Sequence, residues 1–224
     1  MTANEMSGAR YGAIAVATAP VVLAVAFVAH PFIARMPDAE AIAAAVEANQ
    51  TGWVAVHLLT LLGVALTALA FVAIRAHLRD AGENRFSARA LPWVLFGSAL
   101  YGFLPGLEFA PLAAARTGAD VAAAQDTLTP IFLPVLAASA ITFAIGAAGF
   151  AKAVIDSAVL SRSLSRVVAI ALIVLAISRF VPLGVVQFYV QSAAGLVALW
   201  PLAHSLWRAT TPAPNIGRRP AAAG

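Results

Sequence analysis

Long apolar stretches alternate with short polar segments along the whole chain. A helix needs roughly 20 apolar residues to cross the hydrocarbon core of a bilayer. Segments that come close to this length predict six membrane-spanning helices, at residues 12–34, 53–75, 91–113, 129–151, 167–182 and 186–207. Arg179 and Pro182 interrupt the fifth segment, so an interpretation with five spans, and with the termini on opposite sides, stays open. The pattern predicts an all-α polytopic transmembrane helical bundle, formed as a single domain by residues 1–207.

The residue composition indicates the same class of protein. Hydrophobic residues make up 62% of the chain and charged residues only 11%, whereas a soluble domain carries about 25% charged residues. The chain therefore has too few polar groups to cover a globular surface in water. It contains no cysteine, which excludes disulfides, thiolate metal ligands and cysteine nucleophiles.

The basic residues are divided unevenly between the predicted loops. Short loops rich in Lys and Arg remain in the cytoplasm. With both termini inside, three arginines fall on or near the outer side, namely Arg35, Arg116 and Arg179. The remaining basic residues fall on the cytoplasmic side: Arg10, Arg75, Arg79, Arg85, Arg89, Lys152, Arg162, Arg166, Arg208, Arg218 and Arg219. This asymmetry predicts six spans with cytoplasmic N and C termini in the cytoplasmic (inner) cell membrane, and it accounts for the net charge of +4 without nucleic acid.

The segments that flank the predicted spans carry signals of their own. The first apolar run is longer than the roughly 7–15 residues of a signal-peptide core, which predicts a retained helix. Asp38 is a suitable N-cap for a short amphipathic helix on the outer surface, because Ile42, Ala43 and Val46 share one helical face. Residues 117–128 predict a weaker helix of the same kind, and the proline-rich segment 208–224 predicts a disordered cytoplasmic tail.

Small and polar residues form one stripe on each of four predicted helices. The stripes are Gly97, Tyr101, Leu104 and Glu108; His57, Thr60, Val64 and Thr67; Ser139, Thr142, Gly146 and Gly149; and Gln187, Gln191, Ala194 and Ala198. Such stripes face other helices, while large apolar side chains face lipid. Gly102 and Gly106 add a GxxxG pair, which permits close helix packing.

Several ionisable and amide groups fall at a similar depth near the outer ends of these helices. At about 1.5 Å per residue, this depth collects the candidate ligand-binding or proton-relay residues Glu108, His57, Arg179, His30, Tyr101, Gln187 and Gln191. One hypothesis is an outward-facing polar cavity in which Glu108 is the anion and Arg179 or His57 its partner. The alternative is structural: these groups join helices, or Glu108 reaches water among the lipid headgroups.

Other function classes find less support in the sequence. Haem needs histidines paired at matched depth, but His77 lies between Arg75 and Arg79 at the predicted cytoplasmic edge. A transporter or channel could use the helix breaks at Pro105 and Pro182, although no acidic residue continues a path through the inner half. The chain lacks the common hydrolase, nucleotide-binding and metalloprotease motifs, so no catalytic residue, metal or cofactor is predicted.

Two motifs carry a resemblance to a wider group of proteins. The segment from Trp53 through His57 to Gly63 is followed by a helix that ends in Arg75-Ala-His77-Leu-Arg79, and the next helix contains Gly106-Leu-Glu108-Phe. Together they resemble small multi-pass integral membrane proteins of bacteria whose function is uncharacterised. The resemblance implies a bacterial cytoplasmic membrane and no particular activity. We expect a non-enzymatic accessory or ligand-binding protein, whose partners are membrane lipids, a second copy or another membrane protein.

Overall fold

The structure is a computed structural model, and it describes residues 3–211. Within this range the regular structure is helical. The α-helices are α1 (Ala3–Ala29), α2 (Ala39–Ala48), α3 (Gln50–Asp80), α4 (Phe86–Leu107), α5 (Phe109–Thr117), α6 (Val121–Asp156), α7 (Arg162–Ile177) and α8 (Gln191–Ala209). A 3₁₀ turn (Ser178–Phe180) and a π-helical segment (Val185–Val190) lie between α7 and α8. Residues 212–224 of the predicted tail lie outside the described range, and α8 extends into its first residues.

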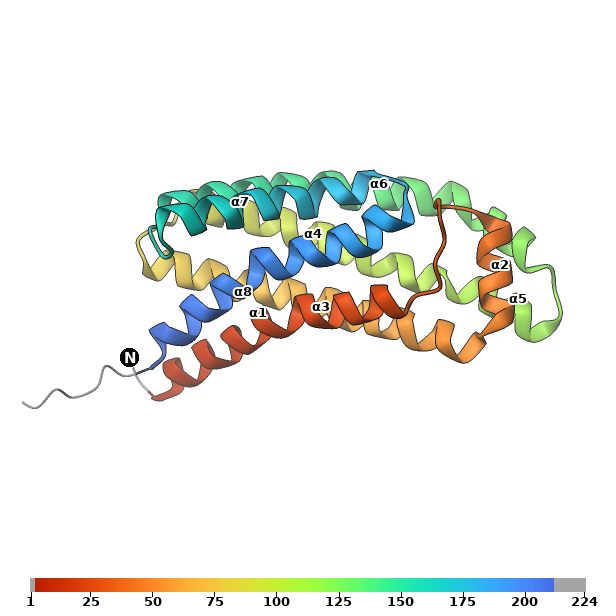
Figure 1. Cartoon of the computed structure of the whole chain (residues 1–224), viewed down its shortest axis with the longest axis horizontal. Helices are drawn as coiled ribbons and strands as arrows, with labels where there is room; N and C mark the ends of the chain where they lie inside the picture. Colours follow the sequence, from red (N-terminus) through yellow and green to blue (C-terminus); the bar gives the residue numbers. More distant parts are fainter. Residues whose placement is uncertain (1–2, 212–224) are drawn as a thin grey trace, which may run out of the picture.

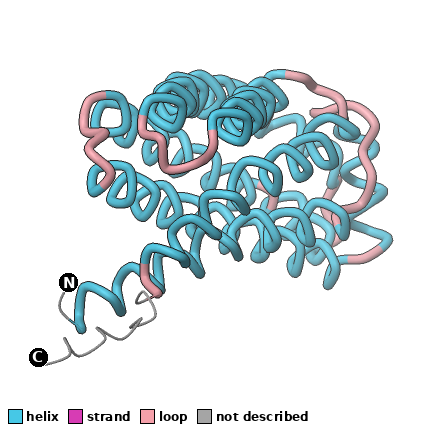
Figure 2. The backbone as a smooth tube through the Cα atoms, turned by 60° about the vertical axis from the view of Figure 1, so that its left-hand side comes forward, coloured by secondary structure: helices cyan, strands magenta, loops and turns pink. Residues whose placement is uncertain are grey.

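Six helical stretches of the described chain are long and apolar enough to cross a membrane, as the sequence pattern predicts. They are Gly8–Ala29, Gln50–Asp80, Phe86–Thr117, Val121–Asp156, Arg162–Phe180 and Val185–Ala209. The long helices run side by side along the long axis, and α2 and α5 lie across one end (Figure 1). We call this the α2 end. The loops around Gly82 and Ser157 lie at the opposite end, and in the described chain loops occur mainly at these two ends (Figure 2).

The exterior of the described chain is apolar and its polar stripes are buried. On α3, Leu58, Leu62 and Leu69 are more than half exposed, whereas His57 and Thr60 are buried. The four predicted stripes all face inward, with only Tyr101 and Gly149 partly buried. This is the reverse of a water-soluble protein and is typical of helices whose large side chains contact lipid.

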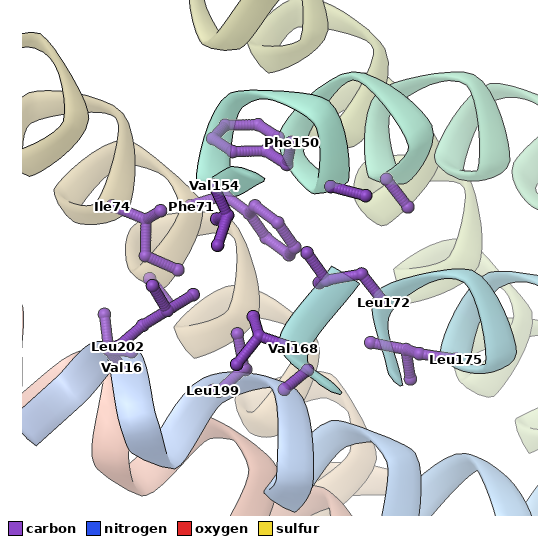
Figure 3. Close-up of a cluster of buried hydrophobic side chains, with 14 of the residues drawn as sticks. Val16, Phe71, Ile74, Phe150, Val154, Val168, Leu172, Leu175, Leu199 and Leu202 are labelled. Atoms are coloured by element: carbon purple, nitrogen blue, oxygen red, sulfur yellow. The ribbon is translucent and has the colours of Figure 1, made fainter. Parts of the chain in front are cut away.

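A close-packed hydrophobic core fills the half of the molecule away from α2. Side chains from α1, α3, α6, α7 and α8 meet around Phe71 and Phe150 (Figure 3). Helices α4 and α6 approach closely because Gly97 faces the backbone of Phe143, and Gly146 faces Val94. The two glycines of the GxxxG pair differ: a Cβ on Gly102 would lie 3.4 Å from Val64 Cγ1 of α3, whereas nothing lies within 4 Å of where a Cβ on Gly106 would be.

Two predictions about the segments at the α2 end have different outcomes. The helix after Asp38 is confirmed as α2: the Asp38 carboxylate accepts a hydrogen bond from Ala41 N (3.0 Å), and the apolar face is buried. The weak helix predicted at 117–128 is wrong, because α5 ends at Thr117 and α6 begins at Val121. Asp120 caps α6 by accepting from Ala123 N at 2.9 Å, so these residues extend a spanning helix.

The division between the last two long helices is irregular. α7 ends at Ile177, five residues before the predicted boundary at residue 182, and the chain is extended at Val181. Pro182 and Gly184 then pair with the segment that follows α1: Met36 N donates to Pro182 O (3.2 Å) and Gly184 N donates to Ala34 O (3.0 Å). These bonds satisfy backbone groups that the interrupted helix leaves without partners.

Candidate functional site

A cavity of about 70 Å³ lies beneath α2, among α1, α3, α4, α6 and the π-helical segment. Five of the seven candidate residues predicted from the sequence line it: His30, His57, Tyr101, Glu108 and Gln187. The rest of the wall consists mainly of apolar and aromatic side chains, namely Phe27, Ile33, Met36, Ile42, Trp53, Leu104, Pro105, Phe132, Leu136 and Phe188, together with Thr60. The other two candidates, Arg179 and Gln191, lie at a separate, smaller cavity.

The rings of His30 and His57 pack against each other at the wall of this cavity. Their ring centroids are 5.2 Å apart in an edge-to-face arrangement; Trp53 packs against both rings and Phe188 packs against His30. His57 Nδ1 lies 2.7 Å from Trp53 O, and His30 Nδ1 lies 2.8 Å from Pro31 O. Because a carbonyl oxygen only accepts, each Nδ1 carries the proton and each Nε2 of the neutral ring is an acceptor. Neither Nε2 has a hydrogen-bond partner within residues 3–211.

Glu108 lies at the junction between α4 and α5. Pro111 has no backbone N–H, so it cannot donate to Leu107 O and α4 ends there. The indole of Trp53 donates to the backbone carbonyl of Glu108, the next residue, at 2.9 Å. The Glu108 side chain is buried at 8% exposure, and its Oε2 has no hydrogen-bond partner in the described chain. The junction therefore holds a carboxyl group in an apolar wall with unused acceptor capacity.

Arg179 lies in the 3₁₀ turn after α7, and its side chain is buried among the helices of the bundle. Its guanidinium carbon lies 3.7 Å from the ring centroid of Phe143 and 4.3 Å from that of Tyr101. The residue is 3% exposed. Tyr101 thus lines the first cavity and also packs on Arg179, while Phe27 lines both cavities.

The predicted partnership of Glu108 with Arg179 or His57 does not form. In the described residues, ion pairs join only Arg79 to Asp80 and Lys152 to Asp156, and both lie at the end opposite α2. The physical reason is the early end of α7, which places Arg179 between Tyr101 and Phe143 and not against the carboxylate.

Sequence reasoning missed Gln125, which is fully buried. Its amide neighbours the Glu108 carboxyl, although neither amide atom makes a hydrogen bond of normal geometry. The residue falls in the segment that the sequence analysis treats as a surface helix. Its signal is the spacing of Val121, Gln125 and Phe132, which places all three on one face of a helix.

The arrangement is that of a small-molecule site in which acceptors are set in an apolar wall. Glu108 and the two imidazoles supply acceptors, and aromatic rings surround them. Within residues 3–211, no group of three or more His, Asp or Glu side chains is placed to hold a metal ion. Comparisons of the chain with protein-family models, with curated proteins and with solved structures find no match.

Proposed function

We propose that the chain is a six-span helical bundle in the cytoplasmic cell membrane, and that its α2 end faces outward and binds a small ligand. Three observations support the proposal. Large apolar side chains cover the exterior and polar stripes are buried. Arg75, Arg79 and Lys152 lie near the end opposite α2, as the positive-inside rule requires. The cavity that brings His30, His57 and Glu108 together carries the functional part of the proposal.

The chemistry of the cavity wall selects the class of ligand. The unpartnered groups at the cavity include three acceptors, Oε2 of Glu108 and Nε2 of each of two neutral imidazoles, beside the amide of Gln187, which both donates and accepts. A ligand head that donates hydrogen bonds satisfies them, and a primary amine offers the largest number of donors for its size. The rings of Trp53 and Phe188 also favour a cationic head. We therefore propose an amphiphile with an apolar body and an amine head, taken from the membrane or from the outer water layer.

The proposal is tested by thermal unfolding of the purified protein in detergent micelles. n-Butylamine, n-butanol and butyrate are the probes, because they share one apolar body and differ in the head group. We expect butylamine to raise the unfolding temperature in a saturable manner, butanol to raise it less and butyrate to have no effect. Tryptophan fluorescence provides a second signal, because Trp53 lines the cavity.

Matched variants connect the effect to the cavity. Glu108→Gln and His57→Ala are expected to weaken the butylamine shift at least tenfold in concentration. Glu47→Gln makes the same chemical change on the exposed face of α2 and is expected to leave it unchanged. The ligand-binding proposal fails if no probe shifts the wild-type protein, or if Glu108→Gln responds as the wild type does.

A small transporter or channel that uses Glu108 is the second candidate function. The observation that favours it is the interrupted segment 178–190, because broken helices supply substrate sites in many transporters. Against it, the other half of the described chain is filled mainly by a hydrophobic core. Proton- or amine-dependent flux in proteoliposomes that is abolished by Glu108→Gln supports this alternative, and the absence of flux together with butylamine binding supports the first.

A further inference from the structure

The buried guanidinium of Arg179 has the surroundings of an incomplete ion site. The rings of Phe143 and Tyr101 lie against the guanidinium, whose hydrogen-bonding capacity is in the N–H groups at its edge. Nε and Nη1 are buried and have no hydrogen-bond partner within residues 3–211. Burial of a cation without a counter-charge costs several kcal/mol in real proteins. The rings offset part of this cost and leave the edge of the guanidinium unsatisfied.

A second cavity, of about 20 Å³, is lined in part by Arg179. Gln191 also lines it and is 2% exposed; its amide neighbours the Tyr101 hydroxyl, but neither amide atom makes a hydrogen bond of normal geometry. The hydroxyls of Thr67 and Ser192 at the same cavity donate to backbone carbonyls of their own helices, to Gly63 O (2.8 Å) and Phe188 O (2.5 Å). The unused donors at the cavity therefore belong to Arg179 and to the amide of Gln191.

The absence of nearby negative charge makes the site selective for anions. In the described chain no carboxylate lies within 4.0 Å of the Arg179 nitrogens, and the other residues at the cavity are neutral. A water molecule needs about 10–15 Å³ of such space, so the cavity holds one particle of that size. Among anions a monatomic ion comes nearest to this size, whereas a phosphate, a sulfate or a lipid head group is larger.

We propose that Arg179, with Gln191, binds one small monovalent anion such as chloride in this cavity. The anion neutralises the guanidinium at the helix interruption and satisfies the N–H groups at its edge. The site is separate from the ligand cavity, and only Phe27 lines both.

The experiment uses the purified full-length protein in detergent micelles. Its unfolding temperature is measured while sodium gluconate is replaced by sodium chloride or bromide at constant ionic strength. We expect halide to raise the unfolding temperature along a saturable curve, by about 5–10 °C when the anion reaches about 100 times its dissociation constant. Sodium sulfate is expected to behave like gluconate, because sulfate exceeds the cavity. Broadening of the ³⁵Cl resonance by the wild-type protein supplies an independent readout.

Variants assign the effect to the two residues. Arg179→Gln is expected to abolish the halide shift, and Gln191→Leu to weaken it at least tenfold in concentration. Arg116→Gln removes an exposed arginine from α5 and is the matched control. If Arg179→Gln does not fold, Gln191→Leu and the wild-type resonance still decide the question.

Two results would overturn the proposal. One is equal stability of the wild type in chloride and gluconate, which means that the cavity holds water or nothing. The other is a halide shift that persists in Arg179→Gln. Glu108→Gln separates this site from the ligand cavity, since it is expected to lose the butylamine response and to keep the halide response.

Discussion

At the end opposite α2, the rings of Phe71 and Phe150 pack with centroids 4.8 Å apart, whereas beneath α2 the same set of long helices encloses a cavity of about 70 Å³. The exteriors of the two halves are similarly apolar. Their interiors differ because glycine and alanine let helices approach in one half, while proline and buried polar residues prevent it in the other. The comparison teaches that a single set of helices can provide stability in one half and a binding site in the other.

The largest expected effect comes from opening a cavity in the packed half. Phe71 is 0% exposed and contacts Phe143 and Phe150. Phe71→Ala is expected to lower the free energy of unfolding by about 3–5 kcal/mol. Phe132→Ala, at the wall of the existing cavity, is expected to cost less by at least about 1 kcal/mol, because that side chain loses fewer packing contacts. SDS-titrated unfolding in mixed micelles measures both. Equal costs would mean that the two halves are packed alike.

The second effect concerns two glycines of the same helix. A Cβ on Gly97 would lie 2.6 Å from Phe143 N, so Gly97→Ala must push α4 away from α6, at a cost of about 1–3 kcal/mol. Gly106→Ala is the control, because its Cβ meets nothing within 4 Å. Alanine in a helix is favoured over glycine by up to about 1 kcal/mol, so this variant is expected to be neutral or stabilising. A loss of stability at Gly106 would restore the GxxxG interpretation.

The third prediction is a gain in stability, because the substitution removes an unfavourably buried carboxyl group from the half that contains the larger cavity. Glu108 buries a carboxyl group whose Oε2 has no partner, and Gln125 beside it has two unpartnered amide atoms. Glu108→Gln keeps the shape, removes the charge and supplies an amide that can bond to Gln125. We expect the free energy of unfolding without ligand to rise by about 1 kcal/mol while the butylamine response is lost. If stability falls instead, the Glu108 carboxylate is a structural group.

Particular residues show how far the sequence predicts this molecule. The six long helices and the inward stripes, such as His57 and Thr60, follow from hydrophobic length and a period of 3.6 residues. The position of each residue along its helix also predicts that His30, His57 and Glu108 lie at a similar depth in the membrane. Depth does not give the direction of a side chain around the helix axis, and for that reason the pairing of Arg179 with Glu108 is wrong.

Two further features could not be read from the sequence. Gln125 was missed because the length of α6 depends on the cap at Asp120, and the same residues are compatible with a separate surface helix. The close contact at Gly97 depends on which residue of α6 lies opposite, and the spacing of glycines within one helix does not contain that information.

The smallest effect is expected from a Glu→Gln substitution at the end opposite α2, at Glu83, whose carboxylate has hydrogen-bond partners. Glu83 Oε1 accepts hydrogen bonds from Arg85 N (2.8 Å) and Phe86 N (2.6 Å), and so caps the start of α4. Burial raises the pKa of Glu83, but the nearby Ser87 hydroxyl and hydrogen bonds from the N–H groups of Phe86, Ser87 and Arg85 lower it by more, and the net pKa lies below its ordinary value.

A lowered folded-state pKa means that Glu83 stabilises the fold above the unfolded-state pKa of about 4.3. This contribution is lost as the pH falls below that value and through the folded-state pKa. Glu83→Gln is therefore expected to cost about 0.5 kcal/mol at pH 7 and to flatten the stability profile between pH 5 and pH 3. Glu47→Gln, on the exposed face of α2, is the control. Glu108→Gln is expected to raise the free energy of unfolding and Glu83→Gln to lower it. If both substitutions change it in the same direction, a buried carboxylate has the same effect on stability at the two ends.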